Sequence, residues 1–506
     1  MLIGQKKYFV LHAPRQTGKT TCMLALMDYL NQQAKYRALY CNVEAAQAMR
    51  EDMAQAMQVI LGELAQMAQI YLQDDFMDQH RHQCLEREGP GNALAALLRS
   101  WSKQSPEPVV LMLDEVDTLI GDSLISLLRQ IRSGYAQRPD YFPQSIMLCG
   151  VRDVRDYRIH SSRTKEIITG GSAFNIKAKS LRLGDFIRPE VETLLMQHTR
   201  ETGQEFTPEA LHCIWHLSQG QPWLVNALAY ETCFEMRECR DRSLAIGKEM
   251  VDQAKDNLIS RRETHLDQLG DKLQEERVQR VIAPMLEGRD LDVRLDDLEY
   301  VQDLGLIRKT DQGPQIANPI YAEIIPRELT ISQQANLEAR YCQAWYIRSD
   351  GSLDMDKLIS AFQEFFREHS EAWLERFQYK EAAPQLLMQA FLQRVVTSGG
   401  RVEREFGLGR MRTDLLVLWP LTEAKPGKPS WTRWQGPVQK AVVELKILYK
   451  SLEKTIEEGL KQTWAYMDRC GTDQGHLIVF DRRDDVSWEE KLFRREEMYQ
   501  GRTITV

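Results

Sequence analysis

The sequence predicts a multidomain α/β protein, because two strand-rich regions are separated by a long helical stretch. In the first region, strand-like segments at 38–43, 109–113, 145–149 and 174–183 alternate with helices, which is typical of a parallel sheet. In the second, a strand pattern beginning at Asp414 is followed by another strand and a long helix. A chain of 506 residues is long enough for about three or four domains, each with its own core.

The segment LHAPRQTGKTT, residues 11–21, lies between an apolar strand pattern and a helix with a spaced apolar face. Backbone N–H groups and the helix N-terminus point into such a turn and bind phosphate. Lys19 adds a positive charge, and Thr20 offers a hydroxyl to Mg²⁺. The predicted nucleotide-binding residues of this loop are Ala13, Pro14, Arg15, Gln16, Thr17, Gly18, Lys19, Thr20 and Thr21.

The loop departs from the GxxxxGK[ST] pattern at Ala13, which stands where the first glycine usually does. Alanine is tolerable there if its φ is negative and the amides of residues 16–20 still form the phosphate cradle. The alternative is a chance match in an ordinary strand-to-helix turn.

The segment PVVLMLDEVDTL, residues 108–119, predicts the second half of an ATP site. Its apolar run reads as a buried parallel strand, and Asp114 follows at the carboxyl end, where open α/β sheets bind ligands. We expect Asp114 to hold the water shell of Mg²⁺ and to belong to the nucleotide site. Glu115 is the predicted catalytic residue that orients or deprotonates the attacking water. A surface acidic run is the alternative.

Charge and cysteine content limit the other possibilities. The net charge of -8 gives no global attraction to nucleic acid, so any such contact requires a local basic patch. The nine cysteines form no CxxC pair, which favours reduced thiols in a cytoplasmic protein. The segment HRHQC, residues 80–84, has metal-ligand types in a predicted polar loop. Neither a signal peptide nor a membrane span is expected.

Five motifs together resemble the bacterial and archaeal AAA-like, STAND-related P-loop ATPases over about residues 1–332. They are the phosphate loop, LMLDEVD, GVRDVRDYR (150–158), GQPWLVNALA (220–229) and LGLIRK…IANPIYAEIIPREL. The resemblance implies a P-loop ATPase core at 1–186, a helical lid at 187–262 and a winged helix at 263–332. In this family the lid and winged helix couple nucleotide state to domain arrangement.

Two features depart from many members of that family. The strand ending at Cys149-Gly150 lacks the Asn or Thr that holds the attacking water. Arg152 and Arg155 either reach the γ-phosphate or form structural ion pairs. A slow switch is therefore expected rather than fast, processive hydrolysis.

After a predicted helical connector at 333–378, residues 379–506 read as a second α/β domain. Asp414 begins a strand, while Glu444 and Lys446 flank Leu445 near the end of the next strand and share one face. Two carboxylates and an ammonium on one sheet face can bind Mg²⁺ and activate water against a phosphodiester. A solvated polar strand face is the alternative.

This arrangement resembles the PD-(D/E)xK nuclease superfamily, and Gln462 with Tyr466 resembles the QxxxY motif of its RecB-like branch. The resemblance implies catalytic roles for Asp414, Glu444, Lys446, Gln462 and Tyr466. With the ATPase site, the predicted metal ligands are Thr20, Asp114, Asp414 and Glu444, for Mg²⁺ or, at the nuclease site, Mn²⁺. The family often has a metal-binding Glu on the preceding helix, where this chain has Gln385 and Gln389. Glu403 or Glu405 could substitute.

Basic and aromatic residues near this site suggest a DNA contact, because cations bind phosphates and indoles stack on unpaired bases. The alternative is a solubilising loop whose tryptophans pack on the domain core. The residues are Arg401, Arg404, Arg410, Arg412, Lys425, Lys428, Trp431, Arg433 and Trp434.

The sequence thus predicts a cytoplasmic ATP-binding and ATP-hydrolysing switch that regulates a metal-dependent DNA nuclease-like effector. The alternative is a non-cleaving, ATP-gated DNA-binding or signalling protein with a vestigial nuclease fold. ATP and DNA are the expected partners, and no membrane association is expected. An ATP-dependent homo-oligomer or a protein partner is left open.

Overall fold

The computed structural model describes all residues except 1, 153–157, 161–166, 170–173, 262–263, 288–292, 312, 330–344, 377–385, 393–398, 406–413, 423–429, 449–450, 482 and 484–485. The chain divides into two compact units. The first comprises Met1–Asp185 with Asp303–Gly305, and the second comprises Phe186–Gln302 with Leu306–Val506.

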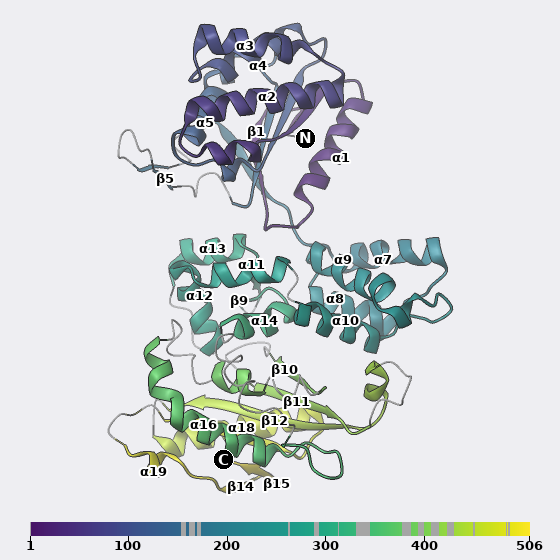
Figure 1. Ribbon diagram of the computed structural model, residues 1–506, viewed down its shortest axis with the longest axis vertical. Coiled ribbons are helices and arrows are strands. Elements are labelled where there is room, and N and C mark those ends of the chain that lie inside the picture. Colours follow the sequence, from purple (N-terminus) through teal and green to yellow (C-terminus); the bar gives the residue numbers. More distant parts are fainter. Residues whose placement is uncertain are drawn as a thin grey trace. The chain divides into compact units, whose positions relative to one another are not determined.

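The first unit contains a five-stranded sheet in the order β2-β3-β4-β1-β7 (Figure 1). All neighbouring strands are parallel, as the alternation of strand and helix patterns predicts. The predicted parallel sheet is therefore confirmed. The strands are β1 (Tyr8–His12), β2 (Arg37–Asn42), β3 (Val109–Asp114), β4 (Ser145–Gly150) and β7 (Lys177–Arg182).

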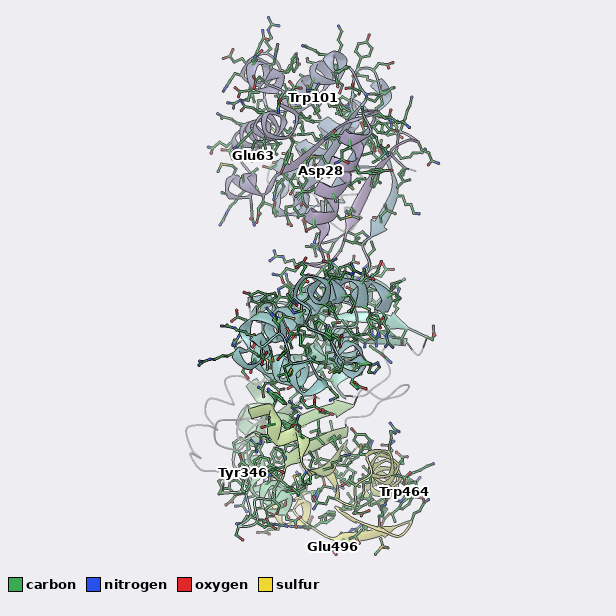
Figure 2. The ribbon with its side chains drawn as sticks, turned by 90° about the vertical axis from the view of Figure 1, so that its right-hand side faces the viewer. Asp28, Glu63, Trp101, Tyr346, Trp464 and Glu496 are labelled. Atoms are coloured by element: carbon green, nitrogen blue, oxygen red, sulfur yellow. The ribbon has the colours of Figure 1, made fainter. Side chains whose placement is uncertain are left out.

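Helices cover both faces of this sheet (Figure 1). α1 (Lys19–Gln32) packs Met23, Met27 and Leu30 against one face. On the other face lies a larger core that includes the fully buried Trp101, whose position is labelled in Figure 2. That core is formed with α2 (Met53–Leu72), α3 (Phe76–Glu88), α4 (Ala93–Gln104) and α5 (Gly121–Ser133).

The segment 80–84 lies within α3, so the prediction of a polar loop is wrong there. The helix is polar on average, but Met77, Cys84 and Leu85 pack on the core, and this apolar stripe keeps it helical. Short elements complete the unit: η1 (Glu44–Met49), η2 (Val116–Thr118), η3 (Tyr135–Gln137), and the antiparallel pair β5 (Arg158–His160) and β6 (Ile167–Thr169).

The second unit begins with helices, as the sequence predicts from residue 187. Proline stands in the first turn of each of the first three helices, where its missing N–H needs no partner. The elements are α7 (Arg188–Thr202), α8 (Pro208–Ser218), α9 (Pro222–Tyr230), η5 (Glu231–Glu235), η6 (Arg237–Arg240) and α10 (Lys248–Arg261).

A helical group with a two-stranded hairpin follows. β8 (Ile307–Thr310) and β9 (Gly313–Ile316) pair antiparallel within the region 263–332. The helices of this group are α11 (Thr264–Leu273), α12 (Glu276–Glu287), α13 (Leu295–Asp303) and α14 (Pro319–Leu329).

The C-terminal part contains a six-stranded mixed sheet in the order β10-β11-β12-β13-β15-β14. β10 to β12 are antiparallel neighbours, β12, β13 and β15 run parallel, and β14 is antiparallel to β15. The strands are β10 (Arg401–Glu405), β11 (Asp414–Pro420), β12 (Val438–Ile447), β13 (Gly475–Phe480), β14 (Glu496–Tyr499) and β15 (Arg502–Thr505).

Period-two alternation gives this sheet two different faces. Val443 and Leu445 of β12 pack in one core with α16 (Met355–Arg376), the helical residues 386–392 and Tyr346, which Figure 2 labels. Val442 of the same strand packs on α18 (Leu452–Cys470) in a separate core. Thus α16, within the predicted connector, shares a core with the sheet. The remaining elements are η7 (Ser430–Gln435) and α19 (Trp488–Lys491).

Candidate functional site

The predicted phosphate loop joins the carboxyl end of β1 to the first turn of α1. Gly18 has a φ of 82° and Gln16 a φ of 56°, whereas Ala13 is not among the residues with positive φ. Ala13 therefore meets the condition for replacing glycine, and its N–H donates to the carbonyl of Gly150. The loop residues Arg15, Gln16, Gly18, Thr20 and Thr21 are exposed, while Pro14 and Thr17 are buried.

Lys19 is buried at the start of α1, and its ammonium stays close to the loop backbone. Its Nζ donates to the carbonyl oxygens of Ala13, at 3.0 Å, and Pro14, at 2.8 Å. The Thr17 hydroxyl donates to the same Pro14 carbonyl, at 2.8 Å. The first N–H groups of α1 have no partner within the helix. The loop thus combines a positive charge with amide donors, which is the donor set that a polyphosphate needs.

Asp114, at the end of β3, is fully buried and lies beside the phosphate loop. Its Oδ2 accepts hydrogen bonds from the Thr20 hydroxyl, at 2.7 Å, and from the Tyr40 hydroxyl, at 3.0 Å. Thr20 and Asp114, predicted as metal ligands from segments far apart in the sequence, are therefore in contact. A hydroxyl and a carboxylate are oxygen donors of the kind that Mg²⁺ prefers, so both fit that ion.

Tyr40 is a residue of this site that the sequence analysis missed. It lies on β2, the strand that pairs with β3, and its ring is buried. Burial and the neighbouring Asp114 carboxylate both raise the pKa of its hydroxyl, which therefore stays protonated and donates. The available signal was a tyrosine inside an otherwise apolar strand predicted to adjoin the strand that ends in Asp114.

Glu115 follows Asp114 in the left-handed region, with a φ of 57°, and is half-buried. Burial raises the pKa of its carboxyl, and the carboxylates of Asp117 and Asp114 raise it further. A raised pKa suits a group that accepts a proton from water. Asp117 accepts a hydrogen bond from the N–H of Val151, at 2.9 Å. Of the two predicted arginines, Arg152 is half-buried, and Arg155 lies outside the described residues.

In the C-terminal sheet, Glu444 and Lys446 lie on the same face of β12, as the alternation predicts. Glu444 is fully buried, and its Oε1 lies 2.6 Å from Nζ of the partly exposed Lys446. β11 and β12 pair with Leu415 opposite Val443, so the next step of this antiparallel register places Asp414 opposite Glu444. Asp414 begins β11, and its side chain is outside the description.

The helix α18 covers the sheet face that carries Glu444. Tyr466 is buried in the core between α18 and the sheet, and Gln462 lies one turn earlier on the same face. The Gln462 Oε1 is buried and has no hydrogen-bond partner among the described residues. Buried polar atoms normally have a partner, so this oxygen is available to a ligand.

The four residues considered as additional metal ligands have different positions. Gln389 is buried in the helical segment 386–392, and Gln385 is outside the described residues. Glu403 is exposed on β10, while Glu405 pairs with Asp414 in the strand register. Within the described part of the chain, no group of three or more His, Cys, Asp or Glu side chains could hold a metal ion.

The structure corrects the prediction that Arg401 belongs to a DNA-binding patch. Arg401 is buried, and its guanidinium pairs with Asp252, at 3.3 Å, and Asp256, at 3.0 Å. It also covers the ring of Trp434, 4.1 Å from the ring centre. These contacts favour the alternative in which the tryptophans pack on the protein.

The remaining members of the predicted patch are less informative. Arg433 lies over the Trp419 ring, and Trp431 is half-buried. Arg410, Arg412, Lys425 and Lys428 are outside the described residues, as is the side chain of Arg404. Among the helices that are described, none is both long and apolar enough to cross a membrane.

Residues 3–157 match the family model described as an AAA domain. The chain therefore contains an AAA-family P-loop ATPase domain, and this fold implies ATP as its substrate. No match was found among curated proteins.

Several solved structures are similar to part of the chain. The Walker-type ATPase PABY2304 of Pyrococcus abyssi is 15% identical, with 63% of this chain and 92% of that chain covered and a TM-score of 0.42. Cdc6p from Pyrobaculum aerophilum is 13% identical, with 63% and 88% covered and a TM-score of 0.35. RuvB, the Holliday junction branch migration motor of Thermotoga maritima, is 13% identical, with 64% and 90% covered and a TM-score of 0.31. At these TM-scores the likeness says nothing about function.

Lys19→Ala should weaken ATP binding by about ten- to a hundredfold, because charge-assisted hydrogen bonds to phosphate are lost.

Glu115→Gln should bind ATP normally and turn over about 100- to 10,000-fold more slowly, because the proton acceptor is removed. Binding and phosphate release, measured separately, test both variants. The exposed Lys35→Ala is the matched control. Normal turnover by Glu115→Gln would refute its role.

The pH dependence of ATP hydrolysis should report the raised pKa of Glu115. The active form is deprotonated, so kcat/KM should fall with decreasing pH at a value above 4.5, the ordinary value of this group. Asp117→Asn should move this acid limb to lower pH, because one neighbouring negative charge is removed. An acid limb that does not respond to Asp117→Asn would assign the titration to another group.

Proposed function

We propose that this protein is an ATP-driven switch in which the AAA-family ATPase domain controls a metal-dependent DNA nuclease-like domain formed by the C-terminal sheet. The observation that carries the nuclease assignment is the ion pair between the fully buried Glu444 and the partly exposed Lys446 on the sheet face covered by α18. The strand register brings Asp414 opposite Glu444, and Gln462 and Tyr466 come from the covering helix. A carboxylate pair, a lysine and a Gln–Tyr helix face match the residue types of a PD-(D/E)xK site.

Each residue has a proposed role in phosphodiester cleavage. Asp414 and Glu444 would hold Mg²⁺ or Mn²⁺, which lowers the pKa of a bound water and polarises the phosphodiester. Lys446 orients the attacking water and neutralises charge that develops on the phosphate. Gln462 and Tyr466 fix the geometry of this face through hydrogen bonds to the substrate backbone or to the metal ligands.

Charged contacts within the second unit support communication toward the nuclease-like sheet. Asp252 and Asp256 of α10 pair with Arg401 at the start of β10, the strand that pairs with β11. Burial alone would raise the pKa of Asp252, but Arg401 and Lys248 outweigh this effect and lower it, so the carboxylate is ionised. A displacement of α10 would therefore pull on the strand beside Asp414.

A non-cleaving, ATP-gated binding protein is the second candidate, and one observation favours it. The carboxylate of Glu444 is already engaged by Lys446 at 2.6 Å, and the helical segment 386–392 carries the neutral Gln389 where the nuclease family often has a metal-binding Glu. Fewer anionic ligands weaken Mg²⁺ binding, and Mn²⁺ tolerates such a site better.

A cytoplasmic location remains part of the proposal on the basis of the cysteine content.

Metal-dependent cutting distinguishes the two candidates. Purified protein should cut linear, nicked or single-stranded DNA with Mg²⁺ or Mn²⁺, and Asp414→Ala, Glu444→Gln or Lys446→Ala should reduce cutting by at least about a hundredfold. ATP hydrolysis should continue in all three, because the ATPase site contains none of these residues. Lys440→Ala and Glu453→Gln are matched controls, since both residues are exposed on the same strand or helix. The absence of cutting with either metal would favour the non-cleaving candidate.

Arg401→Met should uncouple the C-terminal sheet from the nucleotide state. In the wild type, ATP should change amide hydrogen exchange in β11, and this change should shrink in the variant because the link from α10 to β10 is cut. Removing one partner of a buried ion pair also destabilises a protein by about 3–5 kcal/mol, so thermal unfolding is measured in parallel. Arg348→Met, which removes the pair between the exposed Arg348 and the half-buried Asp354, is the control. An unchanged ATP response in a folded Arg401→Met variant would exclude this link.

A further inference from the structure

A cavity of about 110 Å³ lies on the α16 side of the C-terminal sheet. Ile359, Phe362 and Phe366 of α16 line it together with Trp488 of α19. The rings of Phe366 and Trp488 meet edge to face, with centroids 6.3 Å apart. The α16 side is the face opposite to Glu444, because Phe480 of β13 packs toward α16 while Leu477 packs toward α18. Leu452, the first residue of α18, also lines the cavity.

His476 lines this cavity beside the apolar residues of α16, together with polar residues such as Gln363 and Glu490. Its side chain is 6% exposed, and its Nδ1 is buried without a hydrogen-bond partner among the described residues. Burial lowers the pKa of the imidazole to about 4, so the ring is neutral near pH 7. A neutral imidazole can donate from one nitrogen and accept at the other. A buried polar atom without a partner is uncommon in folded proteins and points to a ligand.

Two arginines and a lysine at the cavity already have partners. Arg494 pairs with Asp356, at 2.5 Å, and Arg483 pairs with Asp481, at 2.6 Å. The Lys491 ammonium donates to the carbonyl of Arg483. An anionic ligand would have to break one of these contacts, and any charged ligand would lose hydration in the cavity, whereas an uncharged ligand does neither.

We propose that this cavity binds an uncharged, single-ring aromatic group with a polar atom at its edge, and that His476 hydrogen-bonds to that atom. Apolar cavities of about 150 Å³ hold benzene, so a somewhat smaller cavity that opens to solvent accepts one ring with its polar edge at His476. Phenols and pyrimidine bases share this chemistry. The site is independent of the proposed nuclease function, because none of the residues predicted for that function lines it.

Isothermal titration of the full chain with phenol, thymidine and toluene tests this proposal. Phenol or thymidine should bind at least about tenfold more tightly than toluene, because only they satisfy His476. His476→Phe keeps a ring but removes both nitrogens, and it should abolish this preference while toluene still binds. Binding of thymidine but not phenol identifies a pyrimidine base as the ligand. Titration with oligothymidylate then shows whether the base is bound as part of a single strand or only as a free nucleoside.

Two further variants keep the test decisive. Ile359→Trp should fill the cavity and remove binding of all three probes, whereas His216→Phe, in the helix α8, should change nothing. Circular dichroism and thermal unfolding establish that each variant is folded. The proposal is overturned if neither phenol nor thymidine binds at up to about 10 mM. It is equally overturned if a folded His476→Phe variant keeps the full preference for either probe over toluene.

Discussion

The fully buried carboxylate of Asp114 is the constraint on which the first unit depends. A buried charge without partners is strongly unfavourable, and this one is tolerated because three donors reach it. Two are the hydroxyls of Thr20 and Tyr40, and the third is the backbone N–H of Glu115. These donors belong to α1, to β2 and to the residue that follows β3. A single carboxylate therefore ties the helix after the phosphate loop to two neighbouring strands of the sheet.

Much of this unit could be predicted from the sequence, because its signals are local. An apolar run followed by an acid indicates a buried strand with a polar end, and the loop at 11–21 is recognisable from its flanks. Tyr40 could not be assigned in this way. Its contact with Asp114 depends on how β2 pairs with β3, and the register that places Asn42 opposite Asp114 is a property of the folded sheet.

The C-terminal part shows where local patterns mislead. Alternation correctly placed Glu444 and Lys446 on one face, and helical spacing placed Gln462 near Tyr466. Basic residues that are close in sequence suggested a DNA-binding patch, yet Arg401 is buried against Asp256, 145 positions away. Composition gives the charge of a segment but not its partners. The same limit applies to residues 80–84, where a polar average concealed an apolar stripe that packs on the core.

The two faces of β12 limit which insertions and deletions this domain can accept during evolution. Glu444 and Val443 are neighbours in the chain, yet one faces α18 and the other belongs to the core beside α16. An insertion or deletion of a single residue within the strand would exchange the faces, placing an acid in the apolar core and a valine beside Lys446. Only changes of two residues, or an extra residue absorbed as a bulge, preserve the pattern. Length variation in this domain should therefore accumulate in the connecting loops, while β12 keeps its length.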